Sequence, residues 1–542
     1  MAALARVYGP LMHLKMGFVH VVVAASASVA EQFLKVHDGN FSSRPPNSGA
    51  KHIAYNYQDL VFAPYGPRWR LLRKICALHL FSTKALDDFR HVREEEVGIL
   101  TRALASVGQL PTSIGKMLSV CVTNSIARVM LGRRVVGYGC GSGDEMAEEF
   151  KAMVDELMIL AGVFNIGDFI PPLEAFDLQG VATKMKKLHA RFDTFLTSIL
   201  EEEHNIIKDD DVDSNIKLLS RLISLKLKDV DDCEGERLTD TQIKALLLNL
   251  FVAGTDTTSV TVEWAIAELI RNRKILSQAQ QELDSIVGKD RLVTESDLAQ
   301  LTFLKAIIKE NFRLHPSTPL SLPRIAHENC EINGYFIPKG STLLVNVWAI
   351  GRDPNTWADP LEFRPERFLM GGERSNADVR GNDFEVMPFG AGRRICAGMN
   401  LGIRMVQLVT ATLIHAFDFE LINGQLAQNL NMEEAYGLML QRAHPLMIYL
   451  RPRLASHFAY DIVSIQFMAL EINSTNIDDL FSGNVEDGGY NGPPIVYQDS
   501  DNTIIEMDDE QTSSDSESNV EGYDADLEGD DDFSDLEGDD DE

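Results

Sequence analysis

The last basic residue of this 542-residue chain is Arg453, far from its end. Residues 461–542 contain 27 of the chain's 81 acidic residues and carry −27 of its net charge of −31. A segment with so much like charge and so little apolar cover cannot bury enough surface to fold, and we expect it to be disordered. The sequence therefore predicts a folded domain at residues 1–457 and an acidic tail at residues 458–542.

The first 457 residues have nearly balanced charge and the composition of a globular domain that is large for one core. Helical periodicity dominates from about residue 68 to 315, and strand-like alternation is confined to residues 11–25, 320–347 and 438–450. We expect a mainly α domain with a small β region. No run approaches the roughly 18 apolar residues of a membrane span, and no signal peptide follows Met1. We expect no nucleic-acid partner.

Cys396 stands in a glycine-rich loop directly ahead of an apolar helix predicted at residues 400–416. Free backbone N–H groups and the positive end of that helix favour a thiolate at this position. A thiolate held in this way suits a haem iron. We expect Gly392 and Gly398 to supply positive φ angles and room for a flat macrocycle, and Arg394 to supply a cation for a propionate. A buried cysteine in an ordinary loop is the alternative.

The other cysteines offer no competing metal site, because no C-x-x-C pair and no zinc-like or iron–sulfur spacing occurs. Six cysteines in a chain of this length also argue against a disulfide framework and favour a reducing compartment. The six are Cys76, Cys121, Cys140, Cys233, Cys330 and Cys396.

The longest predicted helix covers residues 239–272 and starts with a capping box formed by Thr239 and Gln242. It is apolar nearly all round, so it should cross the middle of the domain. Its centre, Ala-Gly-Thr-Asp-Thr-Thr at residues 253–258, places poor helix formers where good ones belong, and threonine hydroxyls there can bond to i−4 carbonyls. A kinked or capping segment is one explanation, and a functional site is the other.

These two segments resemble the cytochrome P-450 superfamily. Residues 389–398 match its cysteine-ligand loop, and residues 253–258 match its oxygen-activation motif at all six positions. The resemblance implies the mainly helical prism of that superfamily and a haem b held by thiolate, which favours O–O cleavage. It also implies that an acid and an alcohol relay protons through water. The implied haem-site residues are Phe389, Gly392, Arg394, Cys396 and Gly398, with Cys396 as the iron ligand; the implied relay is Asp256 and Thr257.

Glu310 and Arg313 lie three residues apart in a helix predicted at residues 301–314. Taken alone they would be a surface ion pair. With Arg367 in the downstream Pro-Glu-Arg-Phe, they resemble the family's buried Glu-Arg-Arg network behind the cysteine loop. Its implied role is structural.

Trp69 and Arg73 lie about one turn apart on a helix predicted to begin near residue 68. A surface arginine beside a packed tryptophan is the simple explanation. The resemblance implies instead that both meet the haem propionates, together with Arg394 and Arg324.

Residues 21–26, 163–171, 378–385 and 431–438 are similar to plant flavonoid 3'-hydroxylases. The implied reaction inserts one oxygen atom from O2 at the 3' carbon of a flavonoid B-ring. No flavin or dinucleotide module is visible, so electrons from NADPH are expected to arrive through a separate NADPH-cytochrome reductase. By analogy the substrate pocket includes Phe164, Ala253, Leu320, Leu438 and Met439. Met439 stands where threonine is expected.

Two other functions stay open. One is a flavonoid 3',5'-hydroxylase or another phenylpropanoid hydroxylase. The other is a catalytically impaired, truncated or fused product whose acidic tail binds basic partners. The family usually begins with a membrane anchor that we do not see here. By resemblance we expect the cytosolic face of the endoplasmic reticulum, or a soluble or peripheral protein.

Overall fold

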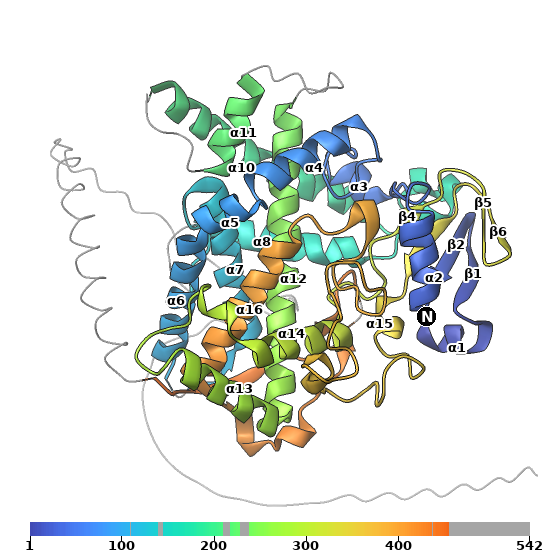
Figure 1. The fold of residues 1–542 in the computed structure, drawn as a ribbon. Coiled ribbons are helices and arrows are strands. Elements are labelled where there is room, and N and C mark those ends of the chain that lie inside the picture. The colour runs from blue at the N-terminus through green and yellow to red at the C-terminus, as the bar shows by residue number, and fades with distance from the viewer. Residues whose placement is uncertain (109, 139–144, 210–216, 228–237, 436, 455–542) are drawn as a thin grey trace, which may run out of the picture. The chain divides into compact units, whose positions relative to one another are not determined.

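The computed structural model describes residues 1–454, apart from residues 109, 139–144, 210–216, 228–237 and 436. Residue 457, the predicted domain boundary, and the acidic tail at 458–542 lie outside the described residues, so both stay predictions. The expected mainly α domain with a small β region is confirmed (Figure 1).

The helices follow the predicted periodicity closely. They are α1 (Ala2–Tyr8), α2 (Ala27–Glu31), α3 (Ser48–His52), α4 (Pro67–His79), α5 (Thr83–Asp88), α6 (Arg90–Ser106), α7 (Ile114–Leu131), α8 (Glu145–Gly162), α9 (Ile166–Phe169), α10 (Val181–Asp209), α11 (Leu218–Leu227), α12 (Asp240–Arg271), α13 (Arg273–Ile286), α14 (Thr302–Leu314), α15 (Val347–Ile350) and α16 (Met399–Ala416).

The strands are short. They are β1 (Leu11–Met16), β2 (Val19–Ala24), β3 (Thr112–Ser113), β4 (Arg324–Ile325), β5 (Cys330–Ile332), β6 (Tyr335–Ile337), β7 (Thr342–Val345), β8 (Phe417–Leu421), β9 (Glu434–Ala435), β10 (Gln441–Arg442) and β11 (Met447–Pro452). They form sheets in the orders β1-β2-β7-β4, β3-β11-β8, β10-β9 and β5-β6.

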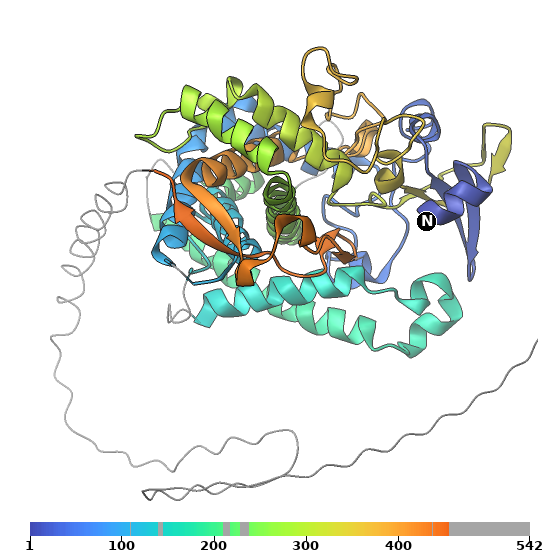
Figure 2. The same ribbon diagram turned by 90° about the horizontal axis from the view of Figure 1, so that it is seen from below.

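The central helix α12 begins with the predicted capping box. The Gln242 N–H donates to Thr239 Oγ1 over 3.2 Å, and the Thr239 N–H donates to Gln242 Oε1 over 2.8 Å. These two bonds satisfy free donors of the first turn. Figure 2 shows α12, in green, nearly end-on with other helices around it.

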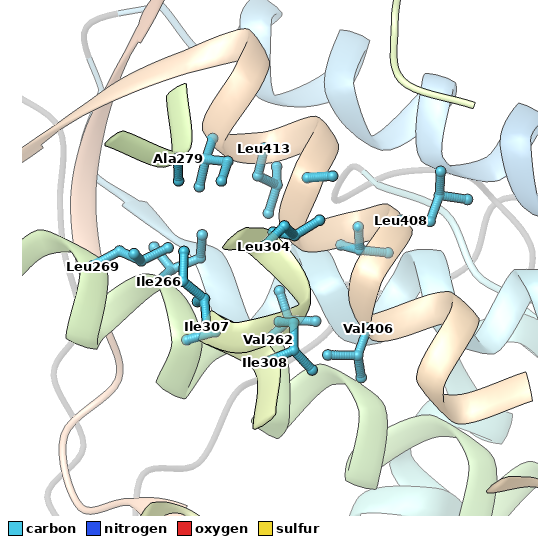
Figure 3. Packing of buried hydrophobic residues seen from close by; sticks show 14 of the residues in the cluster. Val262, Ile266, Leu269, Ala279, Leu304, Ile307, Ile308, Val406, Leu408 and Leu413 are labelled. Carbon is cyan, nitrogen blue, oxygen red and sulfur yellow. The ribbon is translucent and has the colours of Figure 1, made fainter. Parts of the chain in front are cut away.

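The core forms where α12 packs against α7, α14 and α16. Apolar side chains from these helices interlock in Figure 3, where the labelled residues include Val262, Ile266, Leu269, Leu304, Ile307, Val406 and Leu413. Burying each such side chain stabilises the fold by ~1.5–3 kcal/mol. The carboxyl half of α12 is therefore a rigid element on which a site can be built.

The four-stranded sheet brings β4 to the edge of the helical core. The predicted hairpin at residues 11–25 is confirmed, with Leu11 opposite Ala24 and Met16 opposite Val19. Strand β2 pairs in parallel with β7, which pairs antiparallel with β4. As a result Arg324 on β4 is buried beside the loop that precedes α16.

Two helices among the described residues are long and apolar enough to cross a membrane, namely α7 and α12. More than half of each helix's most apolar stretch is buried within the protein, 67% for α7 and 61% for α12, as expected of core helices.

Candidate active site

A cavity of about 300 Å³ lies among α4, α7, α12, the turn after α14 and the loop before α16. Segments that are remote in sequence meet here, from Arg44 to Met405. Of the residues singled out from the sequence, its lining includes Trp69, Arg73, Ala253, Thr257, Arg324, Phe389, Arg394, Cys396 and Gly398. The residues expected to bind the cofactor are Trp69 and Arg73 on α4 and the cysteine loop before α16. They lie far apart in the sequence but line the same cavity.

Cys396 faces this cavity from the loop between a 3-10 turn at Gly392–Arg394 and α16. Its backbone N–H donates to the Phe389 carbonyl over 3.0 Å, which closes the loop. The residue is exposed and forms part of the cavity lining. Burial raises the pKa of the Cys396 thiol, while the Gly398 N–H and the Arg73 guanidinium act in the opposite direction. A cation in the cavity would complete the stabilisation of a thiolate.

The two glycines of the loop differ in their reasons for being glycine. Gly392 has φ of 69°, and a Cβ there would lie 2.4 Å from both the Leu34 carbonyl oxygen and Asp38 Oδ1. The expected positive φ at Gly398 is wrong, because φ there is −87°. A Cβ at Gly398 would touch the Phe81 ring at 3.4 Å, so its small size leaves space at the cavity wall.

Arg394 has one nitrogen, Nη1, without a hydrogen-bond partner in the part of the chain that the structure describes. Its Nε donates to the Ser42 carbonyl and its Nη2 to the Ala63 carbonyl, each over 2.5 Å, and its guanidinium stacks over Trp69 at 4.6 Å from the ring centre. Its Nη1 is buried without a hydrogen-bond partner among the described residues. Burial, and then repulsion from Arg324, lower the pKa of Arg394 to about 10. An unpaired buried donor of this kind indicates a missing acceptor.

Four further arginines line the same cavity, namely Arg44, Arg73, Arg93 and Arg324. Arg324 donates to the Ala391 carbonyl over 2.6 Å and pairs with Asp38 at 3.3 Å, and burial lowers its pKa to about 10. Arg73 donates to the Ile395 carbonyl over 2.8 Å, and burial lowers its pKa as well.

Arg44 is a lining residue that sequence reasoning missed. It donates to the carbonyls of Leu322 and Pro323 over 2.7 and 2.9 Å. Burial, followed by repulsion from Arg324 and Arg394, holds its pKa well below the usual range. Local sequence gave no signal for it, since the Leu322 and Pro323 carbonyls lie more than 270 positions away.

These residues fit an iron porphyrin with two propionates. Buried guanidinium groups that repel one another need anionic partners, and a propionate can accept from Arg394 Nη1. Cys396 presents a thiol to the same cavity as a ligand for iron. Elsewhere among the described residues there is no group of three or more His, Cys, Asp or Glu side chains able to hold a metal.

The centre of α12 contributes the hydroxyl of Thr257 to the cavity. That hydroxyl donates to the Ala253 carbonyl over 2.7 Å, and the Thr261 hydroxyl donates to the Thr257 carbonyl over 2.6 Å. Threonine bonding to i−4 carbonyls was predicted and is confirmed. Asp256 is half-buried and lies outside the described cavity lining.

Glu310 is completely buried behind the cysteine loop and joins two arginines. Its Oε1 and Oε2 each accept from Arg313 over 2.7 Å, and Oε1 also accepts from Arg367 over 3.3 Å. The Arg364 backbone N–H donates to Oε1 over 2.7 Å. The side chains of Glu310, Arg313 and Arg367 are at most 1% exposed, so the three form a buried network rather than a surface pair.

The five residues expected to contact substrate do not all line the cavity. Of the five, the described cavity lining includes only Ala253. Phe164 is half exposed and stacks on Phe169 with ring centres 4.6 Å apart. Met439 is 5% exposed, next to Leu440, whose N–H donates to the Ser317 carbonyl over 2.9 Å. Leu320 and Leu438 are partly buried at neighbouring turns.

A helical fold with a cysteine thiol, buried arginines and a threonine in one cavity defines the haem-thiolate class. The sequence profile described as "Cytochrome P450" matches residues 1–448, and the chain belongs to this family. The family is haem-dependent and takes its electrons from a redox partner.

Named relatives narrow the comparison further. The chain is 75% identical over 453 residues to a protein named "Flavonoid 3'-monooxygenase" from Petunia hybrida, covering 84% of this chain and 88% of the relative. A protein of the same name from Arabidopsis thaliana is 64% identical, with 84% and 87% covered. A "Flavonoid 3',5'-hydroxylase" from Crocosmia x crocosmiiflora is 58% identical, with 84% and 86% covered. A zebra fish cytochrome P450 structure with abiraterone has a TM-score of 0.69 at 25% identity, covering 83% of this chain and 98% of that one.

Proposed function

We propose that this chain is a haem-dependent monooxygenase that hydroxylates flavonoids at the 3' carbon of the B-ring, in flavonoid biosynthesis. The observation that carries this proposal is the convergence of Cys396, Arg394 and Thr257 on one cavity. The identity of 75% to a petunia protein named flavonoid 3'-monooxygenase narrows the substrate class.

The residues of this chain have separate roles in the proposed reaction. Cys396 would hold the haem iron, and Arg44, Arg73, Arg324, Arg394 and the Trp69 indole would hold its propionates. Haem held in this way supplies the reductive activation of dioxygen. Asp256 and Thr257, both on α12, deliver protons through water to the cavity. Leu60, Val61 and Ala253 form an apolar wall that excludes bulk water and orients the flavonoid ring.

The overall reaction is balanced by an external reductant. The flavonoid, O2, NADPH and one proton give the hydroxylated flavonoid, water and NADP⁺. A separate NADPH-cytochrome reductase passes the two electrons to the haem. We place the reaction at the cytosolic face of the endoplasmic reticulum, where such a reductase can meet this chain as a peripheral protein.

Reconstitution of the full chain with haem, a plant NADPH-cytochrome reductase and naringenin tests the proposal. The expected product is naringenin with one added oxygen at the 3' carbon, identified by mass spectrometry and nuclear magnetic resonance. Cys396→Ser should abolish turnover. Cys330→Ser, at a half-buried cysteine remote from the cavity lining, is the matched control and should keep it.

The products also decide between the candidate reactions. Addition of two oxygen atoms, at 3' and 5', would favour a flavonoid 3',5'-hydroxylase, the name carried by the 58% identical relative. A haem-loaded and reducible chain that leaves naringenin, dihydrokaempferol and kaempferol unchanged would contradict the proposed substrate class.

A further inference from the structure

Asn249 on α12 holds a loop against the cavity through two backbone bonds. Its Oδ1 accepts from the Leu60 N–H over 2.9 Å and from the Val61 N–H over 3.1 Å. Both Leu60 and Val61 line the cavity, and so does Asn249 itself. The amide therefore fixes one wall of the cavity to the helix that carries Ala253 and Thr257, one and two turns further along.

Asp59 completes this connection from the loop side. Its carboxylate is completely buried and accepts from the Val61 and Phe62 N–H groups over 3.1 to 3.2 Å. Asp59 Oδ2 and Asn249 Oδ1 therefore share the Val61 N–H as a donor. One carboxylate and one amide thus share three consecutive backbone donors, and every donor has an acceptor.

The same loop is held in an unfavourable backbone conformation. Tyr55, Asn56 and Tyr57 follow one another at φ of 51°, 53° and 63°, all in the left-handed region and none of them glycine. Such residues are strained, and strain persists only where the surroundings fix the conformation. The Val61 carbonyl adds a further bond, since it accepts from Arg44 Nε over 3.2 Å. The position of Leu60 and Val61 therefore depends on a few specific contacts.

We propose that Asn249, which shares the Val61 N–H with Asp59, is a positioning residue that sets how the flavonoid lies between the wall formed by Leu60 and Val61 and the part of α12 that lines the cavity. This inference rests on the proposed function for its substrate. Asn249 acts through the loop, since its carbonyl oxygen is already used by two backbone donors. Loss of the pairing should move the wall, loosen substrate binding and let water reach the reaction, while the cysteine loop stays intact.

An exchange of the two side chains tests the pairing in the full, haem-loaded chain. Asn249→Asp sets a second carboxylate against Asp59, and Asp59→Asn sets one amide against another. The combined Asp59→Asn and Asn249→Asp variant restores one carboxylate, one amide, the net charge and an acceptor for each backbone donor. Asn355→Asp is the matched control, because its amide contacts the Asp353 carboxylate at 2.9 Å on the exposed surface.

The readouts are the naringenin dissociation constant, from the shift of the haem absorbance on binding, and the share of NADPH electrons recovered in product. Asn249→Asp should weaken binding about tenfold, equivalent to ~1.4 kcal/mol, and lower the electron yield. The exchanged variant should return to within about threefold of the wild type, and Asn355→Asp should match the wild type. The reduced, carbon monoxide-bound spectrum should be the same in all of these proteins.

Wild-type binding and electron yield in Asn249→Asp would overturn the inference, as would an exchanged variant no better than the single ones. If a single variant retains no haem, recovery of haem content in the exchanged variant supports the pairing and failure to recover overturns it. If the wild type binds no flavonoid, the proposed function fails separately. The pairing is then decided by whether the two substitutions are coupled in thermal unfolding.

Discussion

Replacing Glu310 with alanine removes the buried carboxylate that pairs with both Arg313 and Arg367. The lost contacts are two 2.7 Å bonds to Arg313, a 3.3 Å bond to Arg367 and the 2.7 Å bond from the Arg364 N–H. Arg313 would keep the carbonyls of Gly351 and Pro360, but its charge would stay buried without a counter-ion. Breaking a buried pair in this way costs ~3–5 kcal/mol, a large part of a typical unfolding free energy of ~5–15 kcal/mol.

The assays are urea unfolding of the full chain, monitored by tryptophan fluorescence, and the haem absorbance of the purified protein. Glu373→Ala is the matched control, since Glu373 also pairs with Arg367 but its side chain is 34% exposed. Because exposed pairs contribute about 0–1 kcal/mol, this control should stay close to the wild type. We expect Glu310→Ala to fail to retain haem. Unfolding free energies within about 1 kcal/mol of each other for the two variants would refute this reasoning.

Three further outcomes are expected. Thr257→Ala should lower the yield of product per NADPH and release peroxide, because Thr257 is assigned to proton delivery; unchanged coupling, measured with a peroxide assay, would count against that role. Met439→Thr should raise turnover of naringenin if the larger side chain narrows access to the substrate pocket; kcat and KM equal to those of the wild type would show that Met439 does not limit turnover. Burial raises the pKa of Asp59 to about 6 from 3.8, so its proton stabilises the fold at low pH, and that contribution is lost as pH rises through 6. The stability of the wild type relative to Asp59→Asn should therefore fall by about 1 kcal/mol from pH 5 to pH 7, measured by urea unfolding; a constant difference would contradict the raised pKa.

Much of the fold was predictable because its signals are local. The capping box of Thr239 and Gln242, the apolar length of α12 and the alternation at residues 11–25 each depend on neighbouring residues. The cysteine loop and the Glu310 pattern were recognised by resemblance, and the structure brings their members together.

The rest of the site depends on contacts that a linear reading does not contain. Arg44 is held at the cavity by the Leu322 and Pro323 carbonyls, far along the chain, as well as by the Val61 carbonyl. Asn249 could have been identified from the sequence, because it is the single amide in the apolar run from 245 to 253. Residues 253–258 were proposed as a functional site because they depart from the helical pattern in a similar way. The φ angle of Gly398 and the positions of Phe164 and Met439 are set by tertiary packing. The resemblance indicated which segments contact substrate, but not where each side chain lies.

The absorbance of the dithionite-reduced, carbon monoxide-treated full chain tests most directly whether Cys396 holds the haem iron. We expect the strongly red-shifted Soret band of a thiolate complex, which Cys396→Ser should lose and Cys330→Ser should keep. A band at the position of a neutral-ligand haem, or no haem binding, would contradict thiolate ligation and favour a catalytically impaired chain.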